Sequence, residues 1–165
     1  MLTKLTIPNP VLPHPTPVYK LNNDPAKLLS WDFVAQQMTA ARHYWLATVA
    51  LDSRPHSTPV WGLWYENRLH VEGNPNSRWI RNLQKNPMIS VSLPSGDKVV
   101  IIEGKIQIIE DDELDEAGWQ QLDTAYQTKY AVKQGSPYIV VHPSKVLAWD
   151  TEGLDTMTRW IFDTE

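Results

Sequence analysis

The 165-residue sequence contains no cysteine. That absence excludes disulfide frameworks, thiol catalysis and cysteine-based zinc sites, and it is typical of proteins of the cytoplasm. Long hydrophobic runs are missing too, since no stretch approaches the roughly 20 apolar residues that a membrane span requires. The N-terminus also lacks the charged-then-apolar layout of a signal peptide. These absences predict a cytoplasmic protein with no membrane partner.

An excess of basic residues is also absent. The formal net charge is -4 and the isoelectric point is about 5.7, and both argue against nucleic acid as a partner. Hydrophobic residues make up 42% of the chain and charged residues 21%, as in ordinary soluble globular proteins. No glycine- and serine-rich linker divides the sequence, so we expect a single domain over residues 1–165.

Compact catalytic and metal-binding motifs are absent as well. The sequence has no GxSxG, GxxxxGK[ST] or GxGxxG pattern, which leaves nucleotide hydrolysis and doubly wound dinucleotide binding without support. The acidic run 110–116 lacks the central glycine of a calcium-binding loop, and we interpret it as the solvated start of a helix. No metal site is expected, because no HxH, HxxxH or HExxH pair occurs. The histidines are His14, His43, His56, His70 and His142.

Proline and tryptophan are abundant instead, with 13 and 8 residues. Prolines concentrate within residues 1–20, where they prevent a helix or a central strand. The Pro-rich N-terminal segment, residues 1–25, is therefore either an extended arm on the surface or on a partner subunit, or a disordered tail. Tryptophan favours cores, interfaces and pockets for flat ligands, and we expect packing and dimer contacts to explain most of the eight.

The rest of the sequence predicts a mostly β protein. Strands are expected at 44–51, 56–65, 69–72, 88–93, 98–110, 138–141 and 145–150, an extended segment at 156–163, and helices after Ser30, at 77–84 and at 112–130. The first three strands form an antiparallel meander. The strand at 98–110 is central or at a subunit interface, because part of it is apolar on both faces. Many short antiparallel strands with a few helices indicate a closed or nearly closed barrel, with helices over its open ends.

The segment 77–83 is the first candidate ligand site. On a helix, Arg78 and Arg81 share one face, while apolar residues anchor the opposite side. Ser77 either caps this helix or donates its hydroxyl to a phosphate, and the helix start supplies unpaired N–H groups. Spacing alone leaves two interpretations open: a phosphate seat, or a capped surface helix with two solvated arginines.

A second candidate lies in the segment 56–61. Pro59 removes one ladder donor, so the strand is expected at a sheet edge or broken at this point. Its backbone groups are then free for a flat heteroaromatic ring with donors and acceptors on its rim. The alternative is an ordinary edge strand that proline protects from further pairing. Near the C-terminus, Arg159 is placed either to reach an anionic ligand or to pair with a carboxylate.

Together, several segments resemble the pyridoxamine 5′-phosphate oxidase-like family of FMN-binding split barrels. The matching segments are Trp45–Val49, Arg54–Trp61, Ser77–Leu83, Asn86–Pro87, Glu103–Gly104, Val146–Trp149 and Thr158–Trp160. Their order and spacing cover about residues 30–162. The resemblance implies an α+β, mainly β fold: an antiparallel six-stranded split β-barrel with peripheral helices. It also implies a homodimer with two FMN sites at the subunit interface.

The resemblance also implies which residues hold the cofactor. The isoalloxazine ring would be lined by Thr58, Pro59, Val60 and Trp61, with Trp149 at its border. The ribityl chain would lie near Val71 and Glu72, and the phosphate would be held by Ser77, Arg78 and Arg81. The other subunit would contribute Lys98 and Val99.

Two departures weaken the link to one particular reaction. Trp79 stands where the family often has lysine, which leaves the phosphate to Arg78 and Arg81. Leu63 stands where the pyridoxamine phosphate oxidases proper carry a cation for the substrate, so vitamin B6 oxidation is not expected.

The leading hypothesis is an FMN-binding oxidoreductase of unknown substrate, in which the flavin carries the chemistry. His56 is the least poor candidate for protonation near the ring, and no catalytic residue is assigned. One alternative is a reductase of the same fold that uses the deazaflavin F420, whose anionic tail would require a basic groove. The other is a flavin- or haem-binding module without turnover, which for haem needs an inward-pointing histidine such as His56 or His70.

Overall fold

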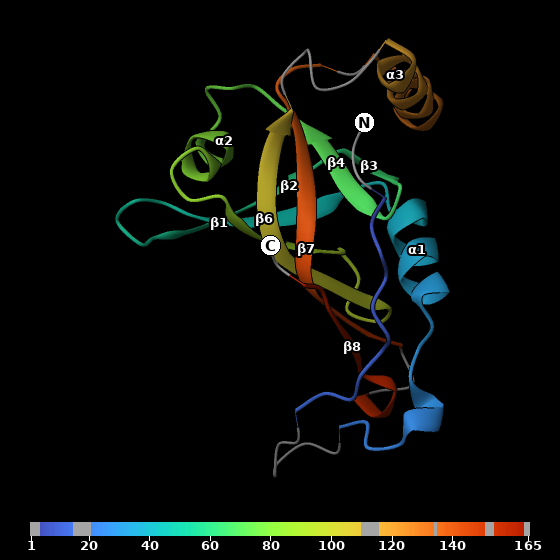
Figure 1. Ribbon diagram of the computed structural model, residues 1–165. Helices are drawn as coiled ribbons and strands as arrows, with labels where there is room; N and C mark the ends of the chain where they lie inside the picture. Colours follow the sequence, from blue (N-terminus) through green and yellow to red (C-terminus); the bar gives the residue numbers. More distant parts are fainter. Residues whose placement is uncertain (1–3, 15–20, 110–115, 134, 151–153, 164–165) are drawn as a thin grey trace.

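The computed structural model describes residues 4–14, 21–109, 116–133, 135–150 and 154–163 (Figure 1). Eight strands and three α-helices occur within these residues. The helices are α1 (Trp31–Ala40), α2 (Arg78–Leu83) and α3 (Glu116–Tyr130), with short 3-10 turns at Pro25–Lys27 and Leu154–Thr156. The strands are β1 (Tyr44–Val49), β2 (Pro55–Val60), β3 (Gly62–Tyr65), β4 (Arg68–Glu72), β5 (Met88–Ser92), β6 (Val99–Ile109), β7 (Tyr138–Trp149) and β8 (Thr158–Ile161).

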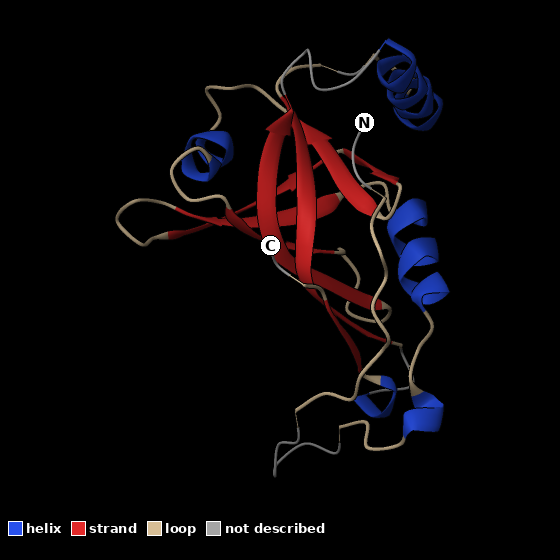
Figure 2. Ribbon diagram, in the orientation of Figure 1, coloured by secondary structure: helices blue, strands red, loops and turns tan. Residues whose placement is uncertain are grey.

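One antiparallel sheet forms the body of the molecule (Figure 2). Its strand order is β2-β1-β5-β6-β7-β4-β3, and β8 pairs with β7 beside this path. The two ends of the path, β2 and β3, are consecutive in the chain with only Trp61 between them. The two edges therefore lie close together and the sheet curves into a split barrel, as the sequence predicted.

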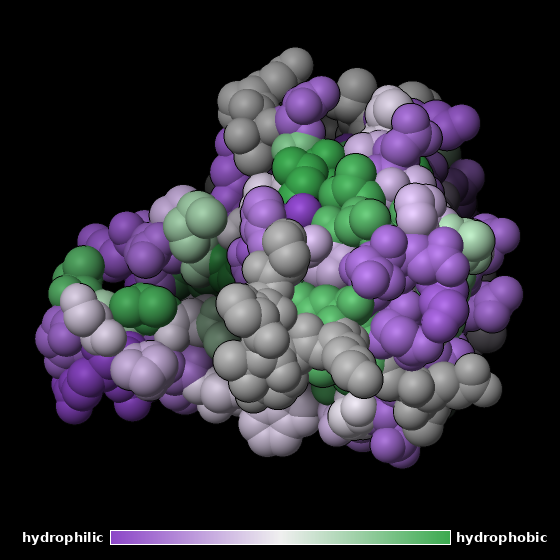
Figure 3. Space-filling model, turned by 90° about the horizontal axis from the view of Figure 1, so that it is seen from below, coloured by the Kyte–Doolittle hydropathy of each residue, from purple (hydrophilic) through white to green (hydrophobic). Residues whose placement is uncertain are grey.

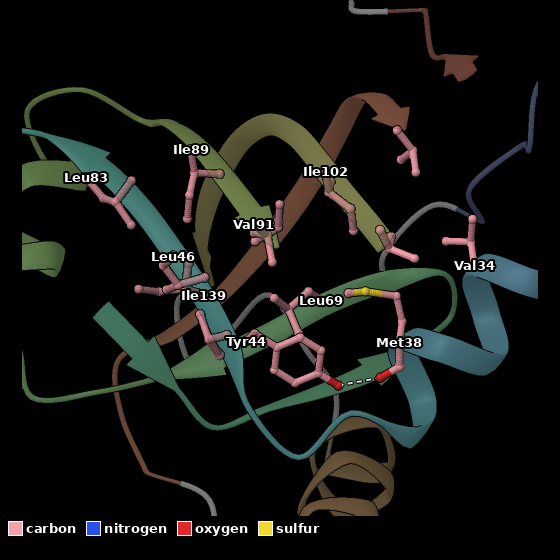
Figure 4. Packing of buried hydrophobic residues seen from close by; sticks show 14 of the residues in the cluster. Val34, Met38, Tyr44, Leu46, Leu69, Leu83, Ile89, Val91, Ile102 and Ile139 are labelled. Carbon is pink, nitrogen blue, oxygen red and sulfur yellow. Dashed lines mark hydrogen bonds between the residues drawn. The ribbon is translucent and has the colours of Figure 1, made fainter. Parts of the chain in front are cut away.

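The barrel core lies on the concave face of the sheet. Alternate residues of β1 are buried, and Tyr44 and Leu46 are among those that point into the core. Val34 and Met38 close the core from α1, and the Tyr44 hydroxyl donates a 2.6 Å hydrogen bond to the Met38 carbonyl (Figure 4). This bond fixes the end of α1 against the start of β1.

A second apolar cluster lies under α3, on the outer face of the sheet. In β7, Ile139 and Val141 belong to the barrel core, whereas Tyr138 and Val140 belong to the cluster beneath α3. Because successive strand residues point to opposite faces, α3 covers the outside of the barrel. It packs there through Leu122, Tyr126 and Tyr130.

Three expectations about the strands need correction. The strand expected at 56–65 is two strands, because its first half, β2, pairs with β1 and its second half, β3, pairs with β4. The strands expected at 138–141 and 145–150 are one strand, β7, which carries a bulge opposite Glu103 and Gly104. The described sheet has eight strands, whereas the resemblance implied a barrel of six. The strand predicted at 98–110 is β6, and its central position between β5 and β7 is confirmed.

The described part of the N-terminal arm is extended and lies on its own chain. The Val11 N–H donates to the Arg159 carbonyl at 2.7 Å, and the reverse bond measures 2.9 Å. The Arg159 Nε donates to the Leu12 carbonyl at 2.9 Å, so this side chain contacts the arm. Residues 15–20 of the arm and 110–115 of the acidic run lie outside the described residues. Among the described helices, none has the length and apolarity to cross a membrane.

Candidate cofactor site

Helix α2 presents its two arginines to solvent, as its sequence predicted. Trp79, Ile80 and Leu83 are buried against the barrel, while Arg78 and Arg81 are exposed. The buried Asn82 amide donates a 3.0 Å hydrogen bond to the Thr48 hydroxyl of β1. The helix is therefore held firmly beside the β1–β2 hairpin, on the left of Figure 1.

Ser77 is the most unusual polar residue of this region. It occupies the N-cap position of α2, yet its side chain makes no capping hydrogen bond. Its Oγ atom is buried and has no hydrogen-bond partner among the described residues. A buried hydroxyl without a partner costs about 1–3 kcal/mol, so a bound acceptor would relieve a real penalty. Ser77 thus fits an anionic oxygen next to Arg78.

Arg81 lines a cavity between α2 and the turn of the β1–β2 hairpin. The cavity has a volume of about 320 Å³, and its lining residues are Ala50, Leu51, Asp52, Arg81, Asn82 and Lys85. Asp52 is paired with Arg54, whose hydrogen bond lowers the pKa of Asp52, and the charge of Arg78 adds to this effect. Arg81 therefore faces a hollow that carries a second cation, Lys85.

Strand β2 supplies the expected edge. It pairs only with β1, with Thr58 opposite Leu46 and Pro59 opposite Trp45, so the prediction that Pro59 marks an edge or a break is confirmed. Val60 ends the strand. Trp61 follows it with 39% of its surface exposed, and its indole stacks on Tyr130 with ring centroids 4.8 Å apart and planes 7° apart. An exposed, held indole is a suitable neighbour for a flat ring.

Two residues of β4 were expected at the ribityl chain, and they differ in environment. The Val71 side chain is fully buried in the barrel core, which leaves only its backbone for a ligand. Glu72 points to the outer face, where Tyr126 hydrogen-bonds to its carboxylate and burial raises its pKa. The Oε2 atom of Glu72 is buried with no hydrogen-bond partner among the described residues. The Oε2 atom of Glu72 is thus a second buried polar atom without a partner among the described residues, close to Ser77 in sequence.

Lys98 and Val99, which the resemblance places on the other subunit, lie at the far end of the sheet, and so does Trp149, which it places at the border of the ring. Val99 and Trp149 are cross-strand partners, and Lys98 precedes them at the start of β6. Glu72 pairs instead with Tyr138, at the opposite end of β7. Since β6 has 11 residues, these ends are separated by about 33 Å along the strand. One chain therefore brings together the expected residues of β4 and α2. Within that chain, Lys98, Val99 and Trp149 lie away from them.

His70 is buried rather than directed at a ligand. Its Nε2 lies 3.2 Å from the Tyr65 carbonyl, which only accepts, so Nε2 carries the proton and Nδ1 accepts from the Tyr138 hydroxyl at 2.6 Å. Burial lowers the pKa of His70 to about 3. His56 is half-buried on β2. No group of three or more metal-binding side chains gathers within the described residues.

Sequence reasoning missed the contribution of α3. Lys129 and Tyr130, in its last turn, contact Gly62, the residue after Trp61. Arg42 lies beside the same pair of rings, 5.7 Å from the Trp61 centroid and 5.5 Å from that of Tyr130. The sequence predicted only a helix at 112–130, and nothing in its pattern indicates where that helix docks.

The curled antiparallel sheet, with a short helix of exposed arginines after its fourth strand, defines a split-barrel protein with a candidate cofactor site. The family model for pyridoxamine 5′-phosphate oxidase matches residues 31–150, most of the chain. The chain therefore belongs to the pyridoxamine 5′-phosphate oxidase family, and the resemblance found in its sequence is confirmed. None of the curated proteins compared with it matches.

Solved structures of proteins named for different cofactors show the same fold. A haem-binding protein from Mycobacterium smegmatis is 19% identical with a TM-score of 0.63, over 81% of this chain and 58% of that one. A pyridoxamine 5′-phosphate oxidase-related, FMN-binding protein from Nostoc punctiforme is 17% identical with a TM-score of 0.55, over 84% and 93%. An F420 reductase is 20% identical with a TM-score of 0.53, over 67% and 93%. At these identities the likeness establishes the fold alone.

Proposed function

We propose that this protein binds FMN and is an FMN-dependent oxidoreductase of unknown substrate, assembled as a homodimer in the cytoplasm. The observation that carries the proposal is the buried, unpartnered Oγ of Ser77 beside the exposed Arg78. A phosphate would accept from both groups, and charge-assisted hydrogen bonds of this kind are the strong ones. Family membership and the FMN-binding protein of the same fold support this cofactor.

The chain's own residues would bind and orient the cofactor. Ser77, Arg78 and Arg81 hold the phosphate, and the backbone of Thr58–Val60 lies along the ring beside Trp61. When bound, a flavin supplies hydride transfer, and the protein supplies position and electrostatics. His70 is unavailable for proton transfer because both ring nitrogens are engaged inside the sheet.

The placement of the expected cofactor residues supports the proposed dimer. Lys98, Val99 and Trp149 lie at the end of the sheet away from Glu72, so they complete the site only if a second copy brings them there. Apolar side chains also remain exposed on β1 and its turn, among them Trp45, Val49 and Leu51. Figure 3 shows apolar residues at the tip of this hairpin, on the left. Such a surface suits an interface with a second copy.

An F420-dependent reductase is the second candidate. The cavity of about 320 Å³ beside Arg81 and Lys85 favours it, because a longer anionic tail would find cations beyond the phosphate seat. The site fits haem less well than it fits a flavin. His70 is enclosed by Tyr65 and Tyr138, which leaves His56 as the axial ligand of that hypothesis.

The test is a titration of the purified protein with FMN, riboflavin, F420 and haem, followed by absorption spectra. We expect FMN to bind, and Arg78→Ala to weaken FMN by about tenfold or more while riboflavin, which lacks the phosphate, is unaffected. Lys133→Ala, which changes an exposed cation outside the site, is the control. Tighter binding of F420 would favour the second candidate, and a Soret band would overturn the flavin proposal.

A mixed dimer tests the shared site directly. Arg78→Ala and Lys98→Ala each damage every site of their own homodimer, if the two residues meet across the interface. Mixing the two variant chains would create heterodimers in which one site carries both changes and the other carries neither. We therefore expect tight FMN binding to return at up to half the sites of each heterodimer. No recovery after subunit exchange would contradict a site built from two chains.

A further inference from the structure

Trp61 stands at the joint where the chain leaves one edge of the sheet and joins the other. Val60, before it, pairs with β1, and Gly62, after it, pairs with Val71 of β4. A Cβ atom on Gly62 would lie 2.9 Å from the His70 carbonyl, so the backbone passes too close to β4 for any other residue. The direction of Trp61 therefore depends on how this joint is held.

The last turn of α3 holds the joint through the backbone N–H and carbonyl of Gly62, the residue after Trp61. The Tyr130 hydroxyl accepts from the Gly62 N–H at 3.0 Å and lies 2.8 Å from the carbonyls of both Gly62 and Arg42, which are the two alternative acceptors of its single proton. The Lys129 Nζ donates to the Gly62 carbonyl at 3.0 Å and to the Tyr44 hydroxyl at 2.9 Å. These two side chains connect the starts of β1 and β3.

The same tyrosine also holds the indole ring. Tyr130 is nearly fully buried and lies parallel to Trp61 at a centroid distance of 4.8 Å. The Arg42 guanidinium is almost equally far from the two centroids, so it lies alongside the stacked pair and contacts both rings. Backbone and side chain of the joint are thus fixed by one residue, while part of the indole stays open to solvent.

Lys129 is an unexpected choice for a purely structural contact. Its ammonium group is half-buried, and both of its hydrogen-bond partners are neutral oxygens. The ion pairs of the described residues involve other cations. Burial and the nearby Arg42 lower the pKa of Lys129 to about 8, which shows that the ammonium is held here at a cost. The contact of the Lys129 ammonium with the Gly62 carbonyl fixes the orientation of the joint.

We infer that Lys129 and Tyr130 are positioning residues of the cofactor site: they clamp the β2–β3 joint and fix the Trp61 indole against which an isoalloxazine ring lies. This inference rests on the proposed function. It adds α3, which follows the sheet's central strand in sequence, to the elements that shape the site. The clamp would act on the ring of the cofactor and not on its phosphate.

The test compares Lys129→Met and Tyr130→Phe with Lys133→Met, an exposed lysine beyond the same helix. Each clamp variant should weaken FMN and riboflavin by the same factor, about tenfold for the loss of one well-placed hydrogen bond. The fluorescence and visible circular dichroism of the bound flavin should change as well, because the indole is no longer fixed. In a Trp61→Leu background, Lys129→Met should have a smaller effect on affinity than in the wild type. Tyr130→Phe keeps the stacked ring, so it serves if Lys129→Met does not fold.

The outcomes separate the inference from the proposed function. A wild-type protein that binds neither flavin overturns the proposed function and the clamp's role with it. If the wild type binds FMN and the clamp variants behave as Lys133→Met does, only the inference fails. Loss of FMN affinity with riboflavin affinity unchanged would show an effect on the phosphate and would also overturn the clamp.

Discussion

The Tyr138 hydroxyl donates a 2.6 Å hydrogen bond to Nδ1 of His70, across two neighbouring strands of the sheet. His70 is 1% exposed, and burial holds its pKa near 3, well below its usual value. Its other ring nitrogen faces the Tyr65 carbonyl. The pair therefore makes His70 a neutral structural residue, which protonation would disrupt.

This pair predicts how stability depends on pH. Between pH 6.5 and about 3 the unfolded chain binds a proton at His70 that the folded chain does not, so stability falls as the pH falls through this window. One such proton gives a slope of at most about 1.4 kcal/mol per pH unit. His70→Gln should flatten the dependence measured by urea unfolding between pH 6.5 and 4, whatever its effect at pH 7. The exposed His43→Gln is the control, and an unchanged slope in His70→Gln would refute the assignment.

A glycine at the β6–β7 bulge predicts a large local effect. A Cβ atom on Gly104 would clash with the backbone carbonyl of His142, which cannot move without breaking the strand pairing. Gly104→Ala should therefore destabilise the protein by about 3 kcal/mol, in the range of strained or overpacked substitutions. Gly96→Ala is a matched control, since a Cβ there meets nothing within 4 Å. Equal unfolding midpoints for the two variants would show that the bulge yields easily.

The same bulge shows where the sequence misled. The strands expected at 138–141 and 145–150 are separated in the sequence by Pro143, and proline is rare inside a sheet. In the structure one strand continues through it: Gly104 pairs with Pro143 and Glu103 with Lys145, and the extra Ser144 donates to the Glu103 carbonyl at 3.0 Å. Proline at a bulge satisfies the same rule, and only the partner strand reveals it.

The candidate site was predictable where it depends on local chemistry. Pro59 indicated an edge, and Ser77 with the arginines after it indicated a short exposed-face helix. What could not be predicted is contact between distant segments. Lys129 reaches Gly62 across 67 positions, and no periodicity in α3 specifies that distance. The buried environment of the Ser77 hydroxyl is likewise a product of packing and not of the motif.

Ser77 offers a test in which stability and binding move in opposite directions. Ser77→Ala removes a hydroxyl that is buried without a partner and makes no capping bond. The free energy of unfolding should therefore stay equal or rise by up to about 1 kcal/mol. The same change should weaken FMN by about fivefold or more and leave riboflavin affinity unchanged, because the lost group faces the phosphate in the proposed site. Thermal or urea unfolding of the ligand-free protein and flavin titration measure the two effects separately. A variant that is less stable than the wild type and binds FMN equally well would mean that the hydroxyl serves the fold, and the phosphate seat would then rest on Arg78 and Arg81 alone.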